Sequence, residues 1–63
     1  MTIYITMYIR EDKISGQTEK RITHADTDKK TAYANMNESN NMWERDDEYA
    51  HEYFDIEETE LYQ

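Results

Sequence analysis

Hydrophobic and polar side chains alternate strictly near the start of the chain, over residues 2–10. One set of alternate positions holds Ile3, Ile5, Met7 and Ile9, and the other holds Thr2, Tyr4, Thr6 and Tyr8. A period of two in β-branched and aromatic residues is typical of a strand whose two faces differ in their surroundings. We therefore predict a strand from Thr2 to Arg10. Its Tyr and Thr face is expected to take part in ordinary sheet packing, and the other possibilities are cover by a helix, exposure or a second contact surface.

The residues that follow indicate a hairpin. The segment 11–17 holds the one glycine of the chain, Gly16, which can adopt positive φ without a steric penalty. Residues 18–24 alternate again, so we predict a second strand that pairs antiparallel with the first. Because Lys20 and Arg21 discourage further pairing, this strand is expected at an edge of the sheet.

A helix is predicted in the middle of the chain. Asp26, Thr27 and Asp28 supply side-chain oxygens for an N-cap, and no Pro or Gly interrupts the residues that follow. The helix is expected to start near Thr27 and to end between Ser39 and Glu44. Its inward stripe at helical spacing is Ala32, Tyr33, Met36 and Trp43.

The acidic segment at the end of the chain fits two structures. As a strand from Tyr53 to Leu61, it places Phe54 and Ile56 on one face, and the other face holds Tyr53, Asp55, Glu57 and Thr59. As a helix, it aligns Tyr49, Tyr53 and Ile56. We favour the strand, because three strands and one helix can close a small core whereas an isolated hairpin is only marginally stable. The predicted fold is therefore a single α+β domain over residues 1–63, a ββαβ unit with one helix packed on an antiparallel sheet.

Charge divides the chain into two unequal parts. Residues 1–37 carry six Lys or Arg and five Asp or Glu, and residues 38–63 carry one Arg and ten Asp or Glu. The two parts therefore have charges of +1 and −9, which sum to the net −8. A dense block of like charge destabilises an isolated fold, and a cationic partner would relieve it.

We therefore identify the acidic block as a candidate surface for a basic protein. Alternate strand residues lie ~6.6 Å apart, so carboxylates there can take the places of phosphates in a nucleic-acid groove. The tyrosines add rigid contact area, and arginine can pair with a carboxylate while stacking on a ring. The alternative is a solvated face that only keeps the protein soluble. The candidate partner-binding residues are Glu44, Asp46, Asp47, Glu48, Tyr49, Glu52, Tyr53, Asp55, Glu57, Glu58 and Glu60. Tyr62 is a further tyrosine within this acidic part of the sequence, whereas Phe54 and Trp43 are expected in the core.

Other chemistry has little support in the sequence. The chain has no cysteine and one glycine, so a cysteine nucleophile and a phosphate-binding glycine loop are both excluded. Glu48 and His51 form a single Glu-x-x-His pair, and Asp26 and Asp28 lack the rest of a calcium loop. We expect no enzyme activity, cofactor or metal.

Direct nucleic-acid binding is disfavoured by the net charge. No apolar run approaches the ~18 residues of a membrane span, so a cytoplasmic protein is expected.

In pattern, the chain resembles the very small acidic proteins that bacteriophages encode against host enzymes, including anti-CRISPR and DNA-mimicking inhibitors. The resemblance lies in the strand 2–10, the Gly16 turn, the helix opening at 26–28 and the acidic block from Asp46 to Glu58. It implies stoichiometric occlusion of the groove of an RNA-guided nuclease or another DNA-processing enzyme in a bacterial host, with no catalytic residue. The alternative hypothesis is a small homodimeric interaction module whose acidic face is merely solubilising.

Overall fold

The computed structural model describes residues 1–61 and begins with the predicted hairpin. Strand β1 (Thr2–Asp12) pairs antiparallel with β2 (Thr18–Asp26), so both strands run two residues beyond their predicted ends. Gly16 has φ +77° in the connecting turn, which confirms its expected role. The Asp12 carboxylate also stabilises this turn, because it accepts the backbone N–H groups of Ile14 and Ser15 at 2.9 and 3.0 Å.

Helix α1 (Lys29–Trp43) begins close to the predicted start near Thr27 and ends within the predicted range between Ser39 and Glu44. Asp28 is its N-cap and accepts the backbone N–H of Thr31 at 3.3 Å, which satisfies one of the unpaired donors of the first turn. Asp26 accepts the N–H of Asp28 at 2.9 Å. Both aspartates therefore have a structural role at the start of the helix.

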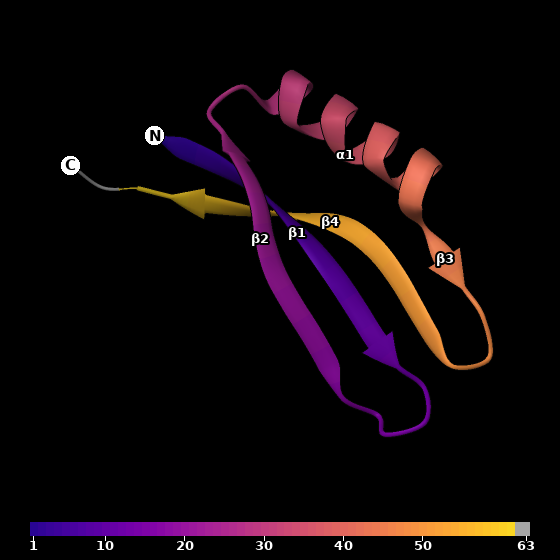
Figure 1. The fold of residues 1–63 in the computed structure, drawn as a ribbon. Coiled ribbons are helices and arrows are strands. Elements are labelled where there is room, and N and C mark those ends of the chain that lie inside the picture. Colours follow the sequence, from indigo (N-terminus) through magenta and orange to yellow (C-terminus); the bar gives the residue numbers. More distant parts are fainter. Residues whose placement is uncertain (62–63) are drawn as a thin grey trace.

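The acidic segment is a strand, as predicted. Strand β4 (Ala50–Glu60) lies beside β1 and pairs with it antiparallel from Thr2↔Glu60 to Asp12↔Ala50. A two-residue strand, β3 (Arg45–Asp46), pairs with the start of β4 and was not predicted. The sheet order is β2-β1-β4-β3, which places the alternating β1 in the interior and β2 at an edge (Figure 1). The fold is α+β, as expected.

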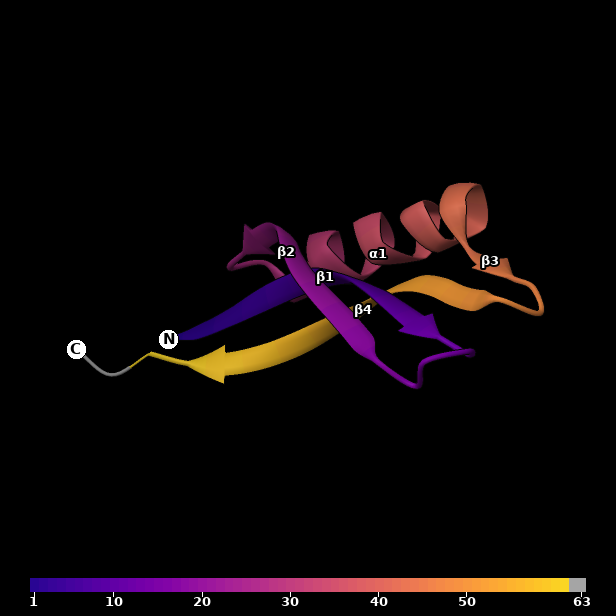
Figure 2. The same cartoon turned by 60° about the horizontal axis from the view of Figure 1, so that its bottom comes forward.

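Helix α1 packs on only one face of the sheet (Figure 2). That face carries the tyrosines of β1, since the Tyr4 ring meets the Tyr33 ring of α1 edge to face at 6.3 Å. Tyr8 packs in the same manner on Phe54, at 5.7 Å between ring centroids. The Tyr and Thr face therefore takes part in ordinary packing, as expected, and the Ile and Met face of β1 points away from the helix.

The buried core is small. The buried apolar residues among those described are Ile9, Ala32 and Ala50, and Phe54 is half-buried. Trp43 was expected in the core, and this prediction is wrong because the side chain is 63% exposed. It belongs to the last turn of α1, where the chain passes into β3, and β3 offers only Arg45 and Asp46 for packing. Within residues 1–61 no helix is both long and apolar enough to cross a membrane.

Candidate partner-binding surface

The alternation of β4 divides the candidate carboxylates between the two faces of the sheet. Its pairing with β1 puts Glu52, Glu58 and Glu60 on the face of the tyrosines and of α1. The same register puts Asp55 and Glu57 on the opposite face, beside Met7 and Ile5. The acidic residues therefore do not form one continuous row.

The three helix-side glutamates have partners within the fold. Glu52 accepts the Tyr8 hydroxyl proton and lies 3.8 Å from Arg10 Nε. Glu58 lies 3.8 Å from the Lys29 ammonium group and accepts the Tyr33 hydroxyl at 3.5 Å.

Glu60 accepts the Thr2 hydroxyl at 2.6 Å and the N-terminal ammonium at 2.9 Å. The hydrogen bond from Thr2 and then the ammonium hold the pKa of Glu60 below its usual value. All three helix-side carboxylates thus contribute to joining β4 to its neighbours.

Three carboxylates before β4 are also used locally. Asp46 binds the Lys13 ammonium group, whose hydrogen bond lowers the pKa of this carboxyl. Asp47 accepts the N–H groups of Ala50 and Tyr49 at 2.9 and 2.8 Å, and these backbone donors lower its pKa. Glu44 lies 3.0 Å from Nε2 of His51. These residues order the turn between β3 and β4.

The remaining candidates point toward solvent. The side chains of Glu48 and Glu57 are exposed and form no hydrogen bond or ion pair with another residue in the range 1–61. Asp55 is exposed and accepts only the N–H of its neighbour Ile56, at 2.8 Å. Tyr49 is 58% exposed. These side chains are available to a partner.

Tyr53 is held in place beside Asp55 and Glu57. Its ring stacks on His51 with 4.6 Å between centroids, and its hydroxyl donates to the Glu11 carboxylate at 2.9 Å. That hydrogen bond raises the pKa of the phenol. The ring is therefore pre-oriented on the face of the sheet that α1 leaves uncovered. Tyr62 lies outside the described residues.

The uncovered side of the sheet is called the open face, and it is defined by Ile3, Ile5, Met7, Ile22, Tyr53, Asp55 and Glu57. Register pairs Ile5 with Glu57 and Met7 with both Asp55 and Ile22. Ile22 is 67% exposed, and Ile5 and Met7 are only half-buried. An uncovered apolar strip thus runs beside two free carboxylates and an oriented tyrosine. The alternation of β1 had indicated an apolar face, and cover of the Tyr and Thr face by a helix was one possibility, but no signal in the sequence decided which face α1 would cover.

Among residues 1–61, no three His, Asp or Glu side chains are grouped so that they could hold a metal ion. His51, from the Glu-x-x-His pair, is directed to Glu44 and stacks on Tyr53. The open face presents apolar, aromatic and anionic groups, and the register brings Lys20, opposite Ile9, to the same side of the sheet. Comparison of the chain with protein-family models, curated proteins and solved structures gave no match.

Proposed function

We propose that this protein is a non-enzymatic inhibitor of the anti-CRISPR type, which acts by stoichiometric binding in the bacterial cytoplasm. Its open face would dock against the basic nucleic-acid groove of an RNA-guided nuclease or another DNA-processing enzyme. The carboxylates would occupy positions that phosphates take in the natural complex, and access of DNA to the groove would be blocked.

The observation that supports this proposal most directly is the composition of the open face. Asp55 and Glu57 have no cationic partner within residues 1–61, and Tyr53 lies beside them on the same strand. Arginine side chains of a nucleic-acid groove can pair with such carboxylates and stack on such a ring. The strip of Ile5 and Met7 would supply the apolar contact that a stable interface needs at its centre.

The test is capture of a nuclease followed by a cleavage assay. The immobilised protein should retain a basic nucleic-acid enzyme from a bacterial lysate, and duplex DNA should release it. Glu57→Gln should weaken inhibition of DNA cleavage. Glu19→Gln removes another exposed strand carboxylate, which lies outside the open face, and should not weaken it. The association rate should fall steeply with added salt. Equal effects of the two variants, or binding unaffected by salt, would contradict the proposal.

A homodimeric module is the second candidate function, and the exposed apolar strip favours it. Two copies could bury Ile3, Ile5 and Met7 against each other by packing their sheets face to face. Because each copy carries −8, such a dimer should strengthen with salt, opposite to binding of a basic enzyme. Sedimentation at low and high salt distinguishes the two. Met7→Glu should abolish the dimer. Ile14→Glu is the control and should leave the dimer intact, because Ile14 lies in the hairpin turn and is 75% exposed.

A further inference from the structure

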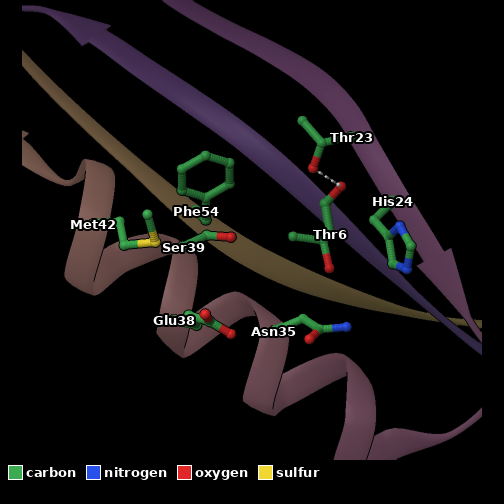
Figure 3. Close-up of a pocket in the computed structure, with 8 residues that line it drawn as sticks. All are labelled: Thr6, Thr23, His24, Asn35, Glu38, Ser39, Met42 and Phe54. Carbon is green, nitrogen blue, oxygen red and sulfur yellow. Dashed lines mark hydrogen bonds between the residues drawn. The ribbon is translucent and has the colours of Figure 1, made fainter.

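A cleft of about 440 Å³ lies between α1 and the sheet, on the side opposite to the open face (Figure 3). Its floor is formed by Thr6 of β1 and Phe54 of β4, and β2 borders it with Thr23 and His24. The helix supplies the other wall. The cleft shares none of the residues that define the open face, so an inference about it goes beyond the proposed function.

The floor of the cleft contains a buried polar atom without a partner. Thr6 is only 4% exposed, and its Oγ1 has no hydrogen-bond partner among residues 1–61. The register pairs Thr6 with His24 and leaves Thr23 as the extra residue of a β-bulge in β2, and the Thr23 hydroxyl donates to the backbone carbonyl of Thr6 at 3.3 Å rather than to its Oγ1. A buried hydroxyl that is left unpaired is destabilising, whereas valine would fill the same space without that cost. The hydroxyl is therefore a candidate contact for a ligand.

The helix wall adds further polar groups. Asn35, Glu38 and Ser39 are three and four residues apart, so they share one face of α1, and all three line the cleft (Figure 3). Glu38 is the one carboxylate in this lining, and it forms no ion pair within the described part of the chain. Together with the net charge of −8, an unpaired carboxylate beside neutral hydrogen-bonding groups favours a cation that donates several hydrogen bonds.

The apolar part of the lining narrows the choice of cation. Phe54 and Met42 border the cleft, and a guanidinium group packs on aromatic faces more readily than an ammonium group does. A second pocket, beside the cleft, is lined by Tyr8, Arg21, Thr23 and Phe54. A guanidinium group already packs on an aromatic ring there, since Arg21 lies 5.7 Å from the Tyr8 ring centroid. Arg21 is paired there with Glu19 at 3.1 Å, so its charge is partly compensated.

We propose that this cleft binds an alkyl guanidinium group, as in arginine. Glu38 pairs with the cation, Thr6 Oγ1 accepts one guanidinium N–H, and Phe54 packs against the guanidinium plane. The neutral side chains of Asn35 and Ser39 accept further N–H groups. Two sources carry this chemistry, namely free arginine and an arginine within a polypeptide.

The experiment is an NMR titration of the isotope-labelled full chain with L-arginine, with Nα-acetyl-L-arginine amide and with Nα-acetyl-L-lysine amide. Saturable shifts of the Thr6, Asn35 and Ser39 amide resonances are expected with one or both arginine compounds, and weaker ones with lysine. Stronger binding of the blocked amide assigns the site to a polypeptide arginine, and stronger binding of L-arginine assigns it to the free amino acid. No saturable shift with either arginine compound, or equal shifts with lysine, overturns the proposal.

Three variants test the assigned contacts. Glu38→Gln should weaken binding by about threefold to tenfold, because it removes an exposed charge-assisted hydrogen bond. Thr6→Val should also weaken binding while the melting temperature rises, a combination that a merely structural role does not give. Glu48→Gln is the matched charge control, because Glu48 is exposed, lies outside the cleft and has no side-chain partner within residues 1–61, and this variant should bind arginine as the unaltered chain does. Loss of binding in Glu48→Gln equal to that in Glu38→Gln would overturn the assignment. Because no nuclease is needed, this result is independent of the inhibitor proposal.

Discussion

The Asn40 side chain of α1 forms two hydrogen bonds with the backbone of Phe54 in β4. Its Nδ2 donates to the Phe54 carbonyl at 2.9 Å, and its Oδ1 accepts the Phe54 N–H at 2.7 Å. β3 pairs with β4 only at His51 and Glu52, so Phe54 is the next residue whose backbone groups face this edge. The side-chain amide thus takes the place of a neighbouring strand and fixes the helix against the sheet.

Asn40→Ala should therefore destabilise the fold, although alanine is the better helix former. The substitution leaves a partly buried N–H and C=O of Phe54 without partners, and we expect a loss of about 1 to 3 kcal/mol in the free energy of unfolding. Urea denaturation followed by circular dichroism measures it. Asn41→Ala is the matched control, because it gains the same helix propensity at an exposed position. Equal stability of the two variants would show that the Asn40 bonds contribute nothing.

Two threonines on the same face of β1 should respond in opposite directions to the same substitution. Thr6→Val removes a buried hydroxyl without a partner within residues 1–61, so it should raise the free energy of unfolding by about 1 to 2 kcal/mol. Thr2→Val instead removes the hydroxyl that donates to Glu60 at 2.6 Å, so it should not stabilise the fold. Thermal melts of both variants provide the comparison. Similar stabilisation by both would mean that the β propensity of valine is the cause.

Local features of the sequence were sufficient to predict the elements. Alternation predicted β1, the N-cap candidates at 26–28 predicted the start of α1, and the single glycine located the hairpin turn, because each of these signals acts within a few residues. The strand β4 was favoured over a helix by the requirement for a third strand. The two-residue β3 has no such local signal, since a strand of this length exists only through its pairing with β4.

Tertiary features were less predictable, for reasons visible in β1. Both faces of this strand carry large side chains, so alternation alone does not decide whether α1 covers Ile5 or Tyr4. The same limit applies to β4, where alternation itself separates Glu57 from Glu58 and so prevents one continuous acidic row. The exposure of Trp43 was unpredictable for a similar reason. The inward-facing stripe of α1 continues into the last turn of the helix, but the sheet beside that turn consists only of the two-residue strand β3.

Acid should unfold the protein through carboxylates that are hydrogen-bonded in the native state. Asp47 and Asp28 have their pKa values lowered below 3.8, by backbone donors and by Thr31 respectively. A carboxyl with a lowered native pKa contributes stability above its unfolded value and loses it as the pH falls through the native one. Stability should therefore decline below about pH 4.

Asp47→Asn tests this dependence. The variant should lose stability near neutral pH and show a shallower decline between about pH 5 and about pH 2, measured by urea denaturation at each pH. Glu57→Gln provides the control, since that carboxylate accepts no hydrogen bond from residues 1–61. An unchanged slope in Asp47→Asn would mean that the turn carboxylate does not link protonation to folding.

Two tyrosines should lose their phenolic protons at a higher pH than an ordinary tyrosine does. Hydrogen bonds to Glu52 and Glu11 raise the pKa values of Tyr8 and Tyr53 above 10.0. An acid with a raised native pKa contributes stability below its unfolded value and loses it as the pH rises through the native one. Phenolate absorbance should therefore show two late steps that coincide with weakening of the fold.

Tyr53→Phe should remove one of these late steps, while Tyr49→Phe, at an exposed position, should leave both in place. Glu11→Gln should bring the Tyr53 step closer to 10.0, because the neutral amide no longer opposes the phenolate charge. If Tyr53 titrates in the Glu11→Gln variant as it does in the unaltered chain, Glu11 does not orient this ring. The open face would then present a mobile tyrosine, and a partner that stacks on it would have to restrict its motion on binding.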